Sequence, residues 1–146
     1  MIITHTPPTD SWLNVFEELH PEPIRWDTEY KRQVVNGNDL SFWVVDKENS
    51  NLYLGEFIVG DGTLGDYMYL MSISSLKKGV GNFMWKYLIE LMQKNVSRVL
   101  GEARPGASWH LAQKYGAVKV SDVLNHGGTG ETYINFYIDL KDSSYD

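Results

Sequence analysis

The fold of this chain is decided by residues 67–93, which read YMYLMSISSLKKGVGNFMWKYLIELMQ. Aromatic and β-branched residues from Tyr67 to Ser74 predict a strand. After a glycine turn, apolar residues recur at helical spacing and predict an amphipathic helix. Its apolar stripe comprises Val80, Phe83, Met84, Tyr87, Leu88, Leu91 and Met92. A helix that joins two parallel strands through a right-handed crossover predicts a ligand site at the carboxyl end of the first strand.

The turn between this strand and this helix carries the clearest sign of function. It runs Leu76-Lys77-Lys78-Gly79-Val80-Gly81 and places backbone N–H groups at the positive end of the helix dipole. The glycines allow a ligand close to the backbone, and Lys77 and Lys78 add positive charge. The turn lacks the longer Walker spacing, and it does not follow the first strand as a dinucleotide fingerprint does. It therefore predicts a site for a pyrophosphate.

The flanking segments extend this pattern into an α/β chain. We expect strands at residues 2–4, 40–45, 52–59, 97–102, 117–124 and 132–140, and helices at residues 9–19, 27–36 and 105–115. In the first of these helices, the apolar face comprises Trp12, Val15, Phe16 and Leu19. The order β-α-α-β-β-β-α-β-α-β-β predicts a mixed sheet with helices on both faces, and 146 residues without repeats or linkers predict a single domain, residues 1–146.

Composition excludes several classes of function. The chain has no cysteine, which rules out disulfides, thiolate metal sites and a cysteine nucleophile, and its 4 histidines lack metal-ligand spacing. No metal site is expected. A net charge of −6 and a pI near 5.1 argue against direct binding to nucleic acid. No apolar run is long enough to span a membrane and the N-terminus does not read as a secretory signal, so we expect a cytoplasmic location.

The order of elements, the glycine loop and the later helix that closes at Gly116 resemble the GNAT family of N-acetyltransferases over nearly the whole chain. The family signature is Gln/Arg-x-x-Gly-x-Gly/Ala. Gly79 and Gly81 match it, whereas Leu76 stands where Gln or Arg is expected. The chain is also similar to small, cysteine-free members that bacteriophages encode, which would place it in a host cytoplasm.

The resemblance implies acetyl-CoA as co-substrate and a primary amine of a protein or small molecule as acceptor. Backbone groups of the glycine loop would bind the pyrophosphate, and the strand around Ser72 would pair with the pantetheine amides. The acyl thioester would lie between this strand and residues 97–102. The residues assigned to coenzyme A are therefore Met71, Ser72, Ile73, Leu76, Lys77, Lys78, Gly79, Val80, Gly81 and Asn82.

The general acid of the family is missing from its usual place. The family often carries Asn near the start of the later helix and Tyr four residues before the closing glycine, where this chain has Pro105 and Ala112. His110, Tyr115 and Ser108 lie on the same helix as alternatives. Tyr115 falls on the stripe expected to pack inward, whereas His110 falls off it and has the titration range that acid–base work needs.

Three carboxylates are alternatives for the base that deprotonates the acceptor: Glu56 on the third strand, Glu102 at the end of the fifth, and Asp66 at the start of the fourth. The replacements at Leu76, Pro105 and Ala112 also leave a second function open. In this alternative the chain is a binding protein that has the GNAT-like scaffold and engages a protein partner. Its catalysis is weak or absent. Family habit implies a monomer or a homodimer.

Overall fold

The structure is a computed structural model that describes residues 1–19, 41–60, 66–125, 128 and 130–140. The described strands form one seven-stranded sheet in the order β1-β2-β3-β4-β5-β7-β6. They are β1 (Ile2–Thr4), β2 (Ser41–Val45), β3 (Tyr53–Gly60), β4 (Tyr67–Ser75), β5 (Arg98–Ala103), β6 (Ala117–Val123) and β7 (Tyr133–Asp139). The expected strands are thus present within one or two residues, and the mixed sheet is confirmed.

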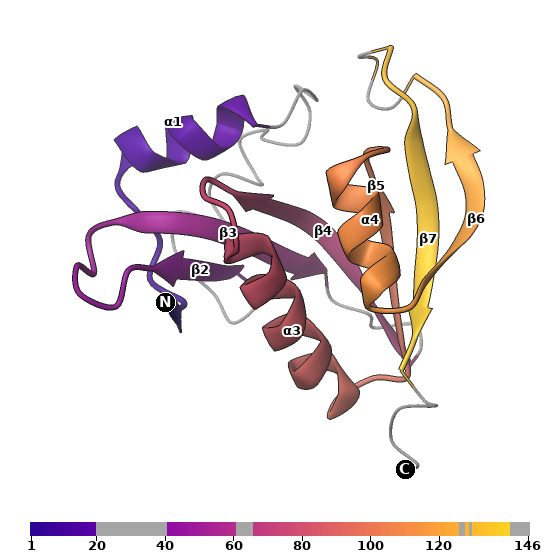
Figure 1. Ribbon diagram of the computed structural model, residues 1–146, viewed down its shortest axis with the longest axis horizontal. Coiled ribbons are helices and arrows are strands. Elements are labelled where there is room, and N and C mark those ends of the chain that lie inside the picture. Colours follow the sequence, from indigo (N-terminus) through magenta and orange to yellow (C-terminus); the bar gives the residue numbers. More distant parts are fainter. Residues whose placement is uncertain (20–40, 61–65, 126–127, 129, 141–146) are drawn as a thin grey trace.

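Within this sheet β4 and β5 run parallel, and the other neighbouring strands pair antiparallel. The long helix α3 (Val80–Gln93) connects β4 to β5, as a parallel pair requires. The crossover that residues 67–93 predicted is therefore confirmed (Figure 1).

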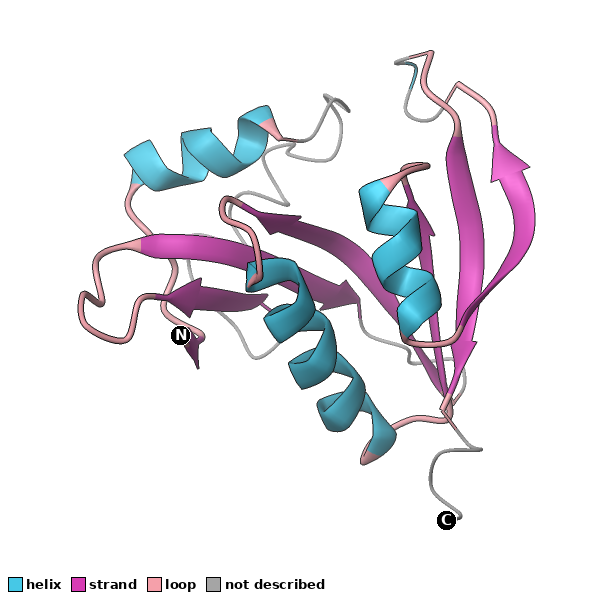
Figure 2. Cartoon of the chain, viewed as in Figure 1, coloured by secondary structure: helices cyan, strands magenta, loops and turns pink. Residues whose placement is uncertain are grey.

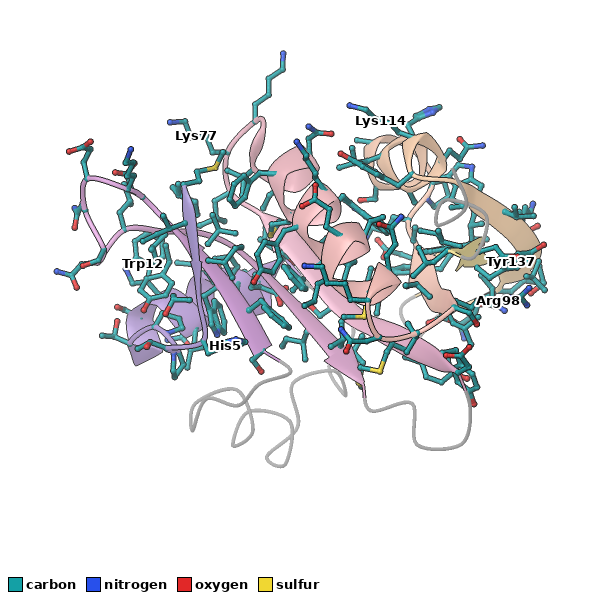
Figure 3. All side chains as sticks on the ribbon, turned by 90° about the horizontal axis from the view of Figure 1, so that it is seen from below. His5, Trp12, Lys77, Arg98, Lys114 and Tyr137 are labelled. Atoms are coloured by element: carbon teal, nitrogen blue, oxygen red, sulfur yellow. The ribbon has the colours of Figure 1, made fainter. Side chains whose placement is uncertain are left out.

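Helices cover both faces of the sheet, as the two views of the ribbon show (Figures 1 and 3). On one face α3 and α4 (Ala107–Lys114) cover the larger apolar core, which includes Phe57, Met84 and Phe136. On the other face α1 (Asp10–Glu18) covers a smaller core around Phe16 and Trp43. The sheet thus separates two cores, and any opening in it joins two sides of the molecule.

The buried faces of two helices differ in detail from the expected stripes. In α1 the buried residues are Leu13 and Phe16, whereas Val15 and Leu19 are exposed. In α3 the unexpected buried residue is Trp85, which stacks on Tyr115 with ring centroids 6.1 Å apart. The reason is that α3 packs against α4 as well as the sheet, so its buried surface is wider than a single stripe.

The helix expected at residues 27–36 lies outside the described residues. None of the helices in the described part of the chain is long and apolar enough to cross a membrane.

Candidate active site where the sheet opens

The central feature of the site is the point at which β4 and β5 part. They pair only from Tyr67–Leu70 with Arg98–Gly101, and beyond that rung each continues against its outer neighbour, β3 or β7. Figure 2 shows the two strands diverging toward the N-terminal ends of α3 and α4. Because the outer neighbours hold both strands, their inner edges face an opening in the middle of the sheet.

A β-bulge in β4 lies directly at this opening. Val59 pairs with Leu70 and Ile58 with Ser72, so Met71 is an extra residue on β4. A bulge changes which way the following side chains point. Leu70 accordingly packs in the core beneath α3, whereas the Ser72 side chain turns to the α1 face and bonds Glu56.

A cavity of about 260 Å³ occupies the opening. Its walls come from β4, β5, α3 and α4, together with Leu19 at the end of α1 and Tyr133 at the start of β7. Of the predicted coenzyme A residues, Met71, Ser72, Ile73 and Gly81 line it. The cavity therefore reaches the glycine loop at one end and the α1 side of the sheet at the other.

The two loop glycines are required for different reasons. Gly79 has φ of 92°, a left-handed conformation that side chains other than glycine adopt with strain, and a Cβ there would meet nothing within 4 Å. Gly81 has ordinary helical geometry, but its Cβ would lie 3.0 Å from Leu111 Cδ2. Gly79 therefore shapes the open turn, and Gly81 lets α3 approach α4.

Positive charge gathers where α3 begins. No described side chain caps the helix, while Lys77 and Lys78 are exposed beside its first turn. From α4, Lys114 Nζ donates a hydrogen bond of 2.9 Å to Asn82 Oδ1. Lys77 and Lys114 both project from the side of the molecule that carries α3 and α4 (Figure 3). An anion at this turn would meet backbone N–H groups and lysines together.

Leu76 takes part in the loop through its backbone. Its N–H donates to the Leu54 carbonyl at 2.9 Å, which anchors the turn to β3, and its side chain is partly exposed. The polar side chain that Gln or Arg would bring at this place is absent, and Lys77 and Lys78 supply positive charge beside it.

The candidate bases occupy different places. Glu56 is fully buried, and its Oε1 accepts a 2.7 Å hydrogen bond from Ser72 Oγ, which lines the cavity. Glu102 lines the cavity itself and is half-buried. Asp66 accepts a hydrogen bond from the Ser97 N–H at the opposite end of β4, away from the cavity. The structure thus brings Glu56, through Ser72, and Glu102 to the cavity, and it leaves Asp66 outside.

The alternatives for a general acid on α4 also lie in different places. Ser108 lines the cavity, whereas His110 is exposed and does not. Ala112 is fully buried in the core. Trp109 packs against Phe136 with ring centroids 6.0 Å apart. No tyrosine hydroxyl therefore occupies the family's usual position for a general acid.

Tyr115 is half-buried at the end of α4. Its hydroxyl donates to Asn82 Oδ1 at 2.8 Å, which ties the end of α4 to the first turn of α3. Burial, and then the nearby carboxylate of Glu90, raise the pKa of the Tyr115 phenol. The phenol is therefore held in its neutral form and supports the loop.

Sequence reasoning assigned neither Arg104 nor Tyr133 to the site, although both line the cavity. Arg104 Nε donates to the Tyr133 hydroxyl at 2.8 Å, and its Nη2 donates to the Leu19 carbonyl at 3.0 Å. Arg104 also lies 3.5 Å from a carboxylate oxygen of Glu131. All but Glu131 line the cavity. Spacing in the sequence could have indicated Arg104. It follows Glu102 by two residues, so the two side chains point to the same side of an extended chain.

Among the described residues, no group of three or more His, Cys, Asp or Glu side chains could hold a metal ion. The polar groups at the opening are serines, a carboxylate, an arginine and a tyrosine. Such a set can attract a cation and move protons.

Among known proteins, this chain is similar to solved structures. No protein-family model matches the sequence, and no curated protein matches it. Among solved structures, Arabidopsis thaliana NAA60 in complex with acetyl-CoA is similar over 96% of this chain and 98% of that chain, with a TM-score of 0.75 and 15% identity.

Two further solved structures show the same likeness. A chain of the NatC complex bound to Gag peptide and CoA matches with a TM-score of 0.71 and 14% identity over 96% of this chain and 99% of that one. The ribosomal-protein-S18-alanine N-acetyltransferase from Escherichia coli matches with a TM-score of 0.65 and 14% identity over 95% and 94%. At this level of identity the likeness establishes the fold, and the chain has the fold of the GNAT N-acetyltransferases.

Proposed function

We propose that this protein transfers an acetyl group from acetyl-CoA directly to a primary amine of a protein or a small molecule. The observation that carries the proposal is the cavity at the parting of β4 and β5, which begins at a glycine loop suited to a pyrophosphate and ends on the α1 side of the sheet. Solved structures of the same fold include complexes with CoA or acetyl-CoA.

The donor end is built from the loop and the inner edge of β4. The turn from Lys77 to Asn82 supplies backbone N–H groups and lysine charge for the pyrophosphate. β4 pairs with β5 only as far as Leu70, so the inner edge of the segment from Met71 to Ser75 can pair with the amides of an extended ligand. Backbone N–H groups held there can also polarise a thioester carbonyl as negative charge develops on its oxygen.

The acceptor end favours a cation. Glu102 lines the cavity, where a carboxylate attracts an ammonium group. Once the proton has left, the amine nitrogen attacks the thioester carbon, and the C–S bond then breaks. An ordinary thiol has a pKa of about 8.5, so the thiolate is a stable leaving group that can take its proton from water. A buried Ala112 is compatible with that route.

The proposed acceptor class, a primary amine, is broader than the substrate of any single protein with a similar structure. Solved structures of this fold include the complex with Gag peptide, the enzyme named for the alanine of ribosomal protein S18, and spermidine N-acetyltransferase. A protein N-terminus, a lysine side chain and a polyamine all present an ammonium group, which is the feature that the cavity suits.

Two measurements test the proposal. Calorimetric titration with acetyl-CoA reports donor binding, and thiol release with spermidine, a lysine peptide and peptides with free N-termini reports transfer. Micromolar binding together with accelerated thiol release supports the enzyme. Binding without transfer to any acceptor, or no binding, would overturn it and favour the alternative, a binding protein with weak or no catalysis.

A further inference from the structure

Glu56 is the single charged residue among the fully or nearly fully buried residues of the described chain. Burying a carboxylate costs free energy unless hydrogen bonds compensate it. It lies opposite Trp43 in the β2–β3 pair and on the same face as Ile58, and both of these residues belong to the smaller apolar core. Its Oε1 accepts a hydrogen bond from Ser72 Oγ across the β3–β4 pair.

Glu56 is connected to the cavity through Ser72. Ser72 Oγ donates to Glu56 Oε1 at 2.7 Å, and Ser72 lines the opening immediately after the bulge at Met71. Without the extra residue the alternation of β4 would place Ser72 on the same face as Leu70, beneath α3. The bulge therefore aims the Ser72 hydroxyl at Glu56 while keeping it at the cavity wall.

The two carboxylates at the opening differ in burial, because Glu56 is fully buried and Glu102 is half-buried. Tyr53 belongs to the same apolar cluster on the α1 face, and burial raises the pKa of its phenol, so it stays neutral. Across the opening lie Glu102, Arg104 and Tyr133. Glu102 is within reach of solvent and suits the attraction of an ammonium group. Glu56 is shielded from solvent and is connected to the cavity by the Ser72 hydroxyl.

We propose that Ser72 and Glu56 form a proton relay for the acetyl transfer, an inference that rests on the proposed function. The acceptor ammonium gives a proton to Ser72 Oγ as the Ser72 hydroxyl proton passes to Glu56 Oε1, which leaves a neutral amine, an intact serine and a protonated carboxyl. The amine then forms the C–N bond, the C–S bond breaks, and Glu56 returns its proton to solvent through Ser72. Ser72 touches the substrate, and Glu56 acts through it.

The test compares Glu56→Gln and Ser72→Ala with two amines of similar size. Ethylamine is protonated near neutral pH and must lose a proton before it attacks, whereas methoxyamine is already uncharged. General-base contributions are typically about 100-fold or more. We expect each variant to lower kcat with ethylamine by about 100-fold and with methoxyamine by less than about 10-fold, with the KM for acetyl-CoA unchanged.

Controls separate the relay from a structural role. The double variant should be no slower than either single one, because the two groups act in series. Ser72→Thr, which keeps a hydroxyl, should recover much of the loss seen in Ser72→Ala. Asp66→Asn makes the same carboxylate-to-amide change at the far end of β4 and should leave both rates unaltered. Calorimetric titration with acetyl-CoA and the thermal midpoint show that each variant is folded.

Three results would overturn the relay. Unchanged rates in Glu56→Gln would remove the carboxylate from the reaction, and equal losses with both amines would mean that it acts on structure. In both cases the unaltered protein still transfers acetyl groups, so the proposed function stands. If the unaltered protein accelerates transfer to neither amine nor to the wider panel, the proposed function fails and the relay fails with it.

Discussion

Leu70 and Gly101 form the last rung of the parallel pair, and Gly101 has no room for a side chain. A Cβ on Gly101 would lie 2.8 Å from Phe136 Cζ and 3.5 Å from Leu70 Cβ. The Phe136 ring therefore packs directly over the backbone of β5 at the point where the sheet opens.

Gly101→Ala should accordingly lower the free energy of unfolding by about 1–3 kcal/mol, the usual cost of overpacking a core. Gly60→Ala is the matched control, because its Cβ would approach the flexible and exposed end of Met71 at 2.9 Å, which can move aside. Urea unfolding of both variants measures the difference. Equal losses would contradict the rigid contact with Phe136.

The glycine loop can be tested with two substitutions at one position. Gly79→Ala and Gly79→Glu both place a Cβ at φ of 92° and should share a backbone strain of about 1–2 kcal/mol. Only glutamate adds bulk and negative charge to the turn. We expect calorimetry to show acetyl-CoA binding at least about 10-fold weaker in Gly79→Glu than in Gly79→Ala. Equal affinities would place the pyrophosphate elsewhere.

The sequence predicted the fold well because its strongest signals are local. The residues from Tyr67 to Met92 carry both the strand pattern and the helical spacing, and the glycine loop between them follows from turn chemistry. The order of β5, β7 and β6 could not be read in this way, because strand neighbours depend on contacts between distant segments.

The site was predictable only in part for the same reason. Glu56 and Ser72 are 16 residues apart, and their hydrogen bond depends on a bulge that alternation alone does not reveal. The bonds from Arg104 to Leu19 and Tyr133 span 85 and 29 residues. His110 has suitable chemistry but is exposed outside the cavity, which only the packing of α4 could show.

A tyrosine placed at position 112, where the GNAT family often carries one, should not supply a general acid. Ala112 is fully buried, so Ala112→Tyr must force a ring into a filled core beneath α4. We expect a loss of stability of about 1–3 kcal/mol or more, measured by urea unfolding, and no gain in kcat. A stable variant with faster acetyl transfer would show that the position can still reach the leaving thiolate.

Arg104 should hold the acceptor end of the cavity together. Arg104→Lys keeps the charge but cannot bond both Tyr133 and Leu19 in the same fork geometry. We expect a raised KM for the amine, unchanged acetyl-CoA affinity and a stability loss of about 1 kcal/mol. Arg98→Lys is the control, because Arg98 lies 4.4 Å above the Tyr137 ring and does not line the cavity. A similar rise in KM for both variants would contradict a specific role.

Alkaline pH should loosen the contact between α4 and the glycine loop. Because burial raises the pKa of Tyr115 above its ordinary value of 10.0, the folded state binds this proton more tightly than the unfolded state does. The resulting stabilisation is complete below pH 10.0 and is lost as the pH rises through the folded-state pKa. Urea unfolding from about pH 8 to pH 11 should therefore show falling stability.

The fall in stability should be shallower in Tyr115→Phe. Part of the fall should remain, since the pKa of Tyr53 is also raised by burial. An unchanged slope in Tyr115→Phe would mean that the phenol does not titrate differently in the folded state.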